Sequence, residues 1–135
     1  MKDAIDLLRR HAQEARDAGR IDEAVERQQE AVALLREDDD PARLAHAIRH
    51  VADILREAGD AAGASAPTAE MLALYRGLED APLLDLANAI RSAALQAEAA
   101  GQPDAALWRE ARDHYEACGI GPGVAEAERR IAALG

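Results

Sequence analysis

The sequence contains no phenylalanine and only one tryptophan and two tyrosines. Large aromatic side chains bury the most apolar area per residue, so the core must be built from smaller groups. Apolar residues still make up 49% of the chain, and many of them are alanine. Alanine removes little surface from water, but it is the best helix former and lets helix axes approach closely. The composition therefore favours an architecture of long, closely packed helices.

Cysteine is almost absent as well, and the single Cys118 excludes an internal disulfide. No stretch approaches the roughly 18 consecutive apolar residues of a membrane span. The first residues, MKDAIDLLRR, lack the apolar segment of a signal peptide. We therefore expect a protein of the reduced cytoplasm that does not enter the membrane.

Positive charge is in deficit, with 16 Lys and Arg against 26 Asp and Glu and a formal net charge of −10. A strongly acidic chain repels polyanions unless it carries a local basic patch. We therefore expect neither nucleic acid nor an anionic membrane as the partner.

What the chain does contain is an internal repeat. The stretch LAHAIRHVADILREAG at 44–59 returns as LANAIRSAALQAEAAG at 86–101, with Leu, Ala, Ile and Arg in register. Fainter copies lie around 8–19 and 124–132. Self-similarity at a period of about 40 residues is typical of helical repeat arrays.

Glycine and proline divide the chain at regular intervals. Glycines 19, 59 and 101 each follow a helical stretch, and prolines 41, 82 and 122 each open the next one. Asp40 is a good N-cap for the helix that follows it. We see no strand signal and predict seven helices, of which six have clear bounds: 3–18, 22–36, 41–58, 82–100, 103–117 and 122–134.

The remaining helix, the fourth, is harder to place. Gly63 and Pro67 fall where its first turns should lie. Both residues disfavour a helix interior. We therefore expect either a late start after a longer turn or a kink at Pro67.

Small residues recur at two slots of the repeat. In the first helix of each pair the slot holds Ala12, Ala52, Ala94 and Ala132, and early in the second helix it holds Ala24, Ala64 and Ala106. In this respect the chain resembles the tetratricopeptide repeat family, and the period is closer to that family's longer repeats of about 40 residues. The large aromatics of the family pattern are missing.

This resemblance implies an all-α, right-handed helical-repeat solenoid of three antiparallel helix pairs with a C-terminal capping helix. It implies one domain over 1–135, with repeats at about 3–39, 40–80 and 81–119 and a cap at 122–134. The chain would then be a scaffold that binds another protein or a peptide, because this family serves many partners and has no single activity.

The resemblance also implies a binding surface, the concave face made by the first helices. One slot of this face is arginine in all four copies, and stacking would align these planar forks to suit carboxylates. The whole stripe holds six arginines and four acids in an otherwise acidic chain. The predicted groove consists of Arg9, Arg16, His46, Arg49, Asp53, Arg56, Asn88, Arg91 and Arg129.

Two interpretations of these arginines stay open. Each could pair within its own helix, Arg49 with Asp53 and Arg9 with Asp6, which adds about 0.2–0.5 kcal/mol per pair. Alternatively the arginines face water and bind an acidic or C-terminal peptide segment. In the second case their substitution would weaken binding and leave stability almost unchanged.

Catalysis and metal binding have weak support. His46, His50 and Asp53 share one helix face and could ligate zinc, but one helix supplies no fourth ligand and Arg49 would repel a cation. His114 and Cys118 have the spacing of a Cys–His pair without a group to orient it. We therefore expect no enzyme activity, no metal and no cofactor.

Three further features are interpreted as structural. His11 lies in a packing stripe and is expected at a helix contact, and Trp108 and Tyr115 are expected in the core. The glycines around Pro122 mark a helix stop and restart, since no strand precedes them as in a phosphate-binding loop. The alternative function is self-association: Ala-rich layers bury little area, so two copies of the chain could form a homodimer.

Overall fold

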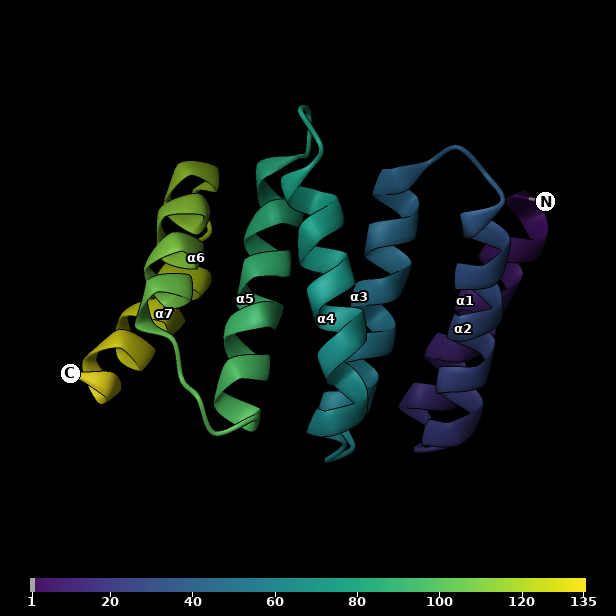
Figure 1. Cartoon of the computed structure of the whole chain (residues 1–135), viewed down its shortest axis with the longest axis horizontal. Coiled ribbons are helices and arrows are strands. Elements are labelled where there is room, and N and C mark those ends of the chain that lie inside the picture. The colour runs from purple at the N-terminus through teal and green to yellow at the C-terminus, as the bar shows by residue number, and fades with distance from the viewer. Residues whose placement is uncertain (1) are drawn as a thin grey trace.

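The computed structural model describes residues 2–135 and contains seven α-helices and no strand over this range (Figure 1). The all-helical prediction is therefore confirmed. The helices are α1 (Lys2–Asp17), α2 (Ile21–Arg36), α3 (Pro41–Glu57), α4 (Ala61–Arg76), α5 (Leu83–Ala99), α6 (Ala105–Cys118) and α7 (Gly121–Leu134).

Each helix packs against its neighbours in the chain, and α3 also contacts α5. In Figure 1, α2 lies in front of α1, α4 in front of α3 and α6 in front of α7, with the two termini at opposite ends of the long axis. We call α1, α3, α5 and α7 the first helices and α2, α4 and α6 the second helices. This alternation leaves one face of the molecule to the first helices.

The helix boundaries follow from capping groups. Asp40 accepts a hydrogen bond from the Arg43 backbone N–H at 3.1 Å, as predicted, and Asp104 caps α6 in the same way. Pro41 is the first residue of α3, but Pro82 precedes α5 and Pro103 lies outside α6. Aspartate at the N-cap therefore sets the starts of α3 and α6, whereas α5 begins after Pro82 without a side-chain cap.

The expected late start of α4 is wrong. The helix begins at Ala61, directly after Asp60, whose carboxylate accepts the Gly63 N–H at 2.8 Å. Pro67 lies inside the helix, which continues to Arg76. The turn before α4 is therefore as short as the turn before α2.

The core is made of thin layers. Ala45, Ala47 and Ala89 are completely buried beside Ile48 and Val51. Tyr75 and Tyr115 are buried in two of the core clusters, and Trp108 is fully buried between Ala94 and Ala127. The core positions predicted for Trp108 and Tyr115 are thus confirmed.

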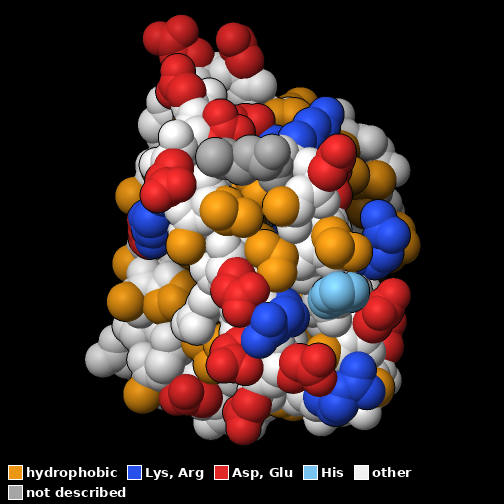
Figure 2. Space-filling model, turned by 90° about the vertical axis from the view of Figure 1, so that its right-hand side faces the viewer, with side chains coloured by type: hydrophobic (Ala, Val, Ile, Leu, Met, Phe, Trp, Pro, Cys, Tyr) orange, Lys and Arg blue, Asp and Glu red, His pale blue; other side chains and the backbone are white. Residues whose placement is uncertain are grey.

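The N-terminal end of the molecule carries exposed apolar side chains. Figure 2 looks at this end and shows hydrophobic groups near its centre with charged groups around them. Leu7 on α1 is 46% exposed, whereas Ala47 and Ala89 in the same slot of the later copies are buried. His11 is exposed too, so its expected helix contact is wrong. Among the described residues, the helix that packs most closely on α1 is α2, and His11 lies outside this contact.

Residues 2–135 include no helix with the length and apolar character needed to cross a membrane.

Candidate functional site

The predicted groove residues all lie on first helices, but most of them bind one another. At the centre, Asp53 of α3 accepts hydrogen bonds from Ser92 Oγ at 2.6 Å and from Arg49 at 3.2 Å. Arg56 pairs with the same carboxylate at 3.0 Å and also donates to the Ser92 carbonyl oxygen of α5. These contacts connect α3 to α5 and engage the polar groups in the middle of the face.

Arg49 therefore does not face water. Its side chain is only 16% exposed and its partner Asp53 only 12%. The pairing predicted within this helix is present, so we now expect the removal of Arg49 to lower stability, contrary to the expectation for an arginine that faces water.

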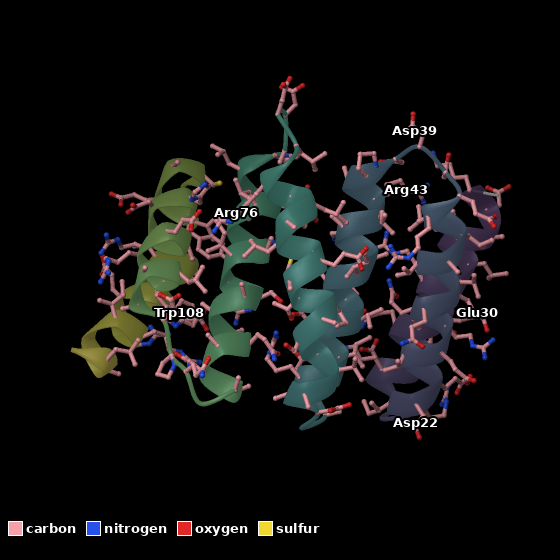
Figure 3. All side chains as sticks on the ribbon, viewed as in Figure 1. Asp22, Glu30, Asp39, Arg43, Arg76 and Trp108 are labelled. Carbon is pink, nitrogen blue, oxygen red and sulfur yellow. The ribbon has the colours of Figure 1, made fainter. Side chains whose placement is uncertain are left out.

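The contact predicted between Arg9 and Asp6 is replaced by contacts between helices. Arg43 of α3 reaches Asp6 of α1 at 2.9 Å, and Arg9 donates to Nδ1 of His46 on α3 at 2.5 Å. Arg43 appears in Figure 3 on the side of α3 that faces the α1–α2 pair. Arg16 of α1 likewise pairs with Glu57 of α3.

His46 lies between two guanidinium groups. Its Nε2 is 3.3 Å from Arg49, and the ring of His50 meets it edge-on with centroids 4.7 Å apart. Burial, followed by Arg9 and Arg49, lowers the pKa of His46 from 6.5 to about 4. Burial and Arg49 lower the pKa of His50 to about 3. Both imidazoles are therefore neutral at pH 7.

The possible metal ligands do not gather into a site within residues 2–135. No group of three or more His, Cys, Asp or Glu side chains there is placed to hold a metal ion. His114 bonds through Nδ1 to the Glu110 carbonyl oxygen of its own helix at 2.8 Å, so this nitrogen is not available to Cys118.

A hollow of about 360 Å³ opens between α5 and α7, and we call it the C-terminal hollow. Three predicted groove residues line it, together with apolar side chains at its edge. Arg91 forms two hydrogen bonds across it to Glu126, at 2.5 and 3.1 Å, and the hydroxyl of Tyr115 donates to Asn88 at 2.6 Å. The lining includes Leu84, Asn88, Arg91, Tyr115, Ile120, Glu126 and Arg129.

Arg129 is the exposed cation of this hollow. No ion pair or hydrogen bond among residues 2–135 involves its guanidinium group, whereas Arg91 is held by Glu126. The Arg91 bond lowers the pKa of Glu126, with smaller contributions from Arg130 and Arg129. The hollow therefore contains one engaged and one available guanidinium.

The wall of this hollow depends on glycine. A Cβ atom at Gly123 would lie 2.5 Å from the Tyr115 ring, so only glycine lets α7 approach this closely. The sequence marked this stretch as a helix restart, which is correct, but not as part of a hollow.

A second, smaller hollow of about 240 Å³ lies between α1, α2 and α3, and we call it the N-terminal hollow. Its lining is entirely polar: Arg9, Arg10, Gln13, Gln28 and His50. Of these only Arg9 belonged to the predicted groove. Gln28 is a buried amide on α2, four residues after the small slot at Ala24, and its burial was not visible in the sequence.

The second helices carry ion pairs that sequence reasoning missed. Arg36 of α2 forms a two-bond fork with Glu70 of α4, at 2.6 and 2.8 Å. Arg76 of α4 forms the same fork with Glu110 of α6, at 2.7 and 2.8 Å. The signal was available, since both the arginine and the glutamate recur at the repeat spacing. Figure 3 shows Arg76 between α4 and α6.

A scan against protein-family models finds no match to this chain, and a search of curated proteins finds none.

Proposed function

We propose that this chain is a cytoplasmic scaffold module of the tetratricopeptide type, a right-handed solenoid without catalytic activity, which binds an acidic peptide segment. The support for the architecture is the repeat in the sequence together with the alternation of first and second helices along one axis. The support for the ligand is the C-terminal hollow.

The single observation that carries the proposal is the exposed guanidinium of Arg129 in a hollow that also has apolar lining. Leu84 is 43% exposed at its edge, and Ile120 lines it from the position directly before α7. Concave sites with an apolar wall and a few fixed polar groups are typical of ligand binding.

The lining suggests how a peptide is held. A carboxylate pairs with Arg129 as a planar fork, while an adjacent aliphatic side chain covers Leu84 and Ile120. Glu126 keeps Arg91 in place and repels a second acid, so one carboxylate per hollow is expected. Tyr115 donates to the Asn88 side-chain oxygen, and we propose that the Asn88 amide N–H groups donate to the peptide backbone.

The test is a titration with a labelled peptide of alternating Glu and Leu residues. Arg129→Ala should weaken binding by about 1–3 kcal/mol, the scale of a charged hydrogen bond lost. Arg129→Lys should restore only part of it, since an ammonium group cannot form the fork. Comparing the peptide with a free and an amidated C-terminus shows which carboxylate is bound.

Arg109→Ala is the matched control, because Arg109 is also exposed and lies on α6 outside the hollow. Equal weakening by both variants would mean that the peptide responds only to net charge. Absence of binding, combined with a mass by light scattering that rises with concentration, would favour the alternative of a homodimerisation module. The exposed Leu7 is the observation that keeps this alternative open.

A further inference from the structure

The N-terminal hollow has a lining that the peptide proposal does not use. It contains two guanidinium groups, two carboxamides and an imidazole, with no acid and no hydrocarbon side chain. An apolar side chain placed here would cover the buried Gln28 and the half-buried Arg9 and His50 without pairing their donors. The natural occupant of the hollow is therefore a polar group with several acceptor atoms.

The charge of the hollow is positive. Within residues 2–135, Arg9 has one hydrogen-bond partner, the neutral His46, and Arg10 has no ion pair. Burial, followed by Arg43, lowers the pKa of Arg9, and the nearby Asp6 offsets only part of this shift. Asp6, the acid that would serve Arg9, is bound by Arg43 instead.

The remaining groups are donors. Gln28 is 3% exposed and gives one amide N–H to the Ala47 carbonyl oxygen at 3.3 Å, which leaves its second N–H. Gln13 is held in the same way by Asp17 at 2.8 Å. His50 is neutral, so one of its ring nitrogens carries a proton.

These donors come from three different helices, α1, α2 and α3, and surround the space. A planar carboxylate accepts in its own plane, whereas a phosphoryl group offers three oxygens in a tetrahedral arrangement. We propose that the N-terminal hollow binds a phosphoryl group, as free phosphate or as a phosphate monoester, with the two arginines and the carboxamides as its ligands.

The test is an NMR titration of the full chain with inorganic phosphate at constant ionic strength. Backbone and side-chain signals of Arg9, Gln28 and His50 should shift together and saturate. Arg10→Glu should lower the affinity by about tenfold or more, because it replaces a charge-assisted donor by a repelling acid. Arg10 is exposed, so the helix should remain folded, and circular dichroism of the variant checks this.

Two controls separate this site from the peptide hollow. Arg129→Glu makes the same charge change on α7 and should leave phosphate affinity within about twofold, while it abolishes acidic-peptide binding. Gln28→Leu keeps the buried volume and should weaken phosphate binding without touching peptide binding. Failure of the peptide titration alone therefore leaves the phosphate result intact, and the reverse also holds.

A comparison of two probes, a capped phosphoserine tripeptide and inorganic phosphate, identifies the source of the phosphoryl group. A capped phosphoserine tripeptide that binds more tightly than inorganic phosphate assigns the hollow to a phosphorylated partner chain, and equal affinity assigns it to a free phosphate. Either result supports the site. Shifts that do not saturate, or an equal loss in Arg10→Glu and Arg129→Glu, would overturn it.

Discussion

At the scale of single residues, the arginine slot of the repeat has a different partner in each of the first three copies and, within residues 2–135, none in the fourth, Arg129. Arg9 and Arg91 each reach the next first helix, where they meet His46 and Glu126. Arg49 would meet Asn88 in the same way, but Asn88 is bound by Tyr115, and Arg49 turns to Asp53 in its own helix.

The two neutral histidines beside this slot make stability depend on pH. The pKa values of His46 and His50 are about 4 and 3 in the folded chain, against 6.5 for an unperturbed imidazole. Between these values the unfolded chain binds more protons, so stability falls as pH is lowered. Thermal unfolding should therefore occur at a lower temperature at about pH 5 than at about pH 7.

The charged groups that set these pKa values are Arg9, Arg49, Asp53 and, for His46, Asp85. Carboxylates such as Glu126 also have pKa values lowered from the usual 4.5. Their protonation therefore reduces stability at a lower pH than that of the histidines. The double variant His46→Asn and His50→Ser copies the residues of α5 in these slots. Its melting temperature should change less between the two pH values than that of the unmodified chain. An equal change in both chains would exclude the histidines as the cause.

The repeat in the sequence placed the four arginines in one slot, and the spacing of residues predicted the Arg49–Asp53 pair. The sequence did not predict that Arg9 turns to a histidine or that Arg43 takes Asp6. Pairing within a helix follows from spacing alone. Pairing between helices depends on the distance between the helix axes, and the residue pattern does not predict this distance.

At the scale of elements, α4 shows how a residue that breaks helices can support one. A Cβ atom at Gly63 would lie 2.2 Å from the Asp60 carboxylate, so glycine lets this carboxylate reach the backbone N–H that it caps. The sequence reading took Gly63 as evidence against a helix start, whereas the structure uses it to make the cap.

Pro67 remains a weak point inside α4, because it has no N–H to donate to the carbonyl of Gly63. Pro67→Ala should therefore stabilise the chain, by about 1–3 kcal/mol once relaxation around the ring is allowed for. Urea unfolding followed by circular dichroism measures the change.

Pro103 gives the matched control, since it lies outside α6. Pro103→Ala should give no gain, and a small loss is expected because the unfolded chain becomes more flexible. A gain of similar size in both variants would show that the effect does not come from the helix interior.

At the scale of the whole molecule, the repeat predicted the number and order of helices. It did not predict the two hollows, because their presence depends on which first helices touch. Ser92 and Asp53 bond α3 to α5. Polar side chains of α1, α2 and α3 line one hollow, and the other lies between α5 and α7 beside Gly123. Ser92 is a small residue at the slot of His50. The sequence shows this difference, but only the structure shows that it allows the contact with Asp53.

Trp108 is the only indole in the chain, and it is fully buried between Ala94 and Ala127. Its Nε1–H donates to Glu98 at 2.9 Å, and the Arg130 guanidinium lies 5.4 Å from its ring centre. Its intrinsic fluorescence therefore reports on α5, α6 and α7, whereas far-ultraviolet circular dichroism reports on every helix.

Repeat arrays are stabilised mainly by contacts between neighbouring units, so the two ends need not unfold together. At about pH 7 the fluorescence and dichroism curves in urea should coincide, as for a cooperative unit. At about pH 5 the histidines of α3 weaken only the N-terminal half, and helix content should decline before the emission of Trp108 shifts. Coincident curves at both pH values would mean that the seven helices unfold as one. The lone indole thus gives the C-terminal half an optical signal of its own, which can be followed without any added label.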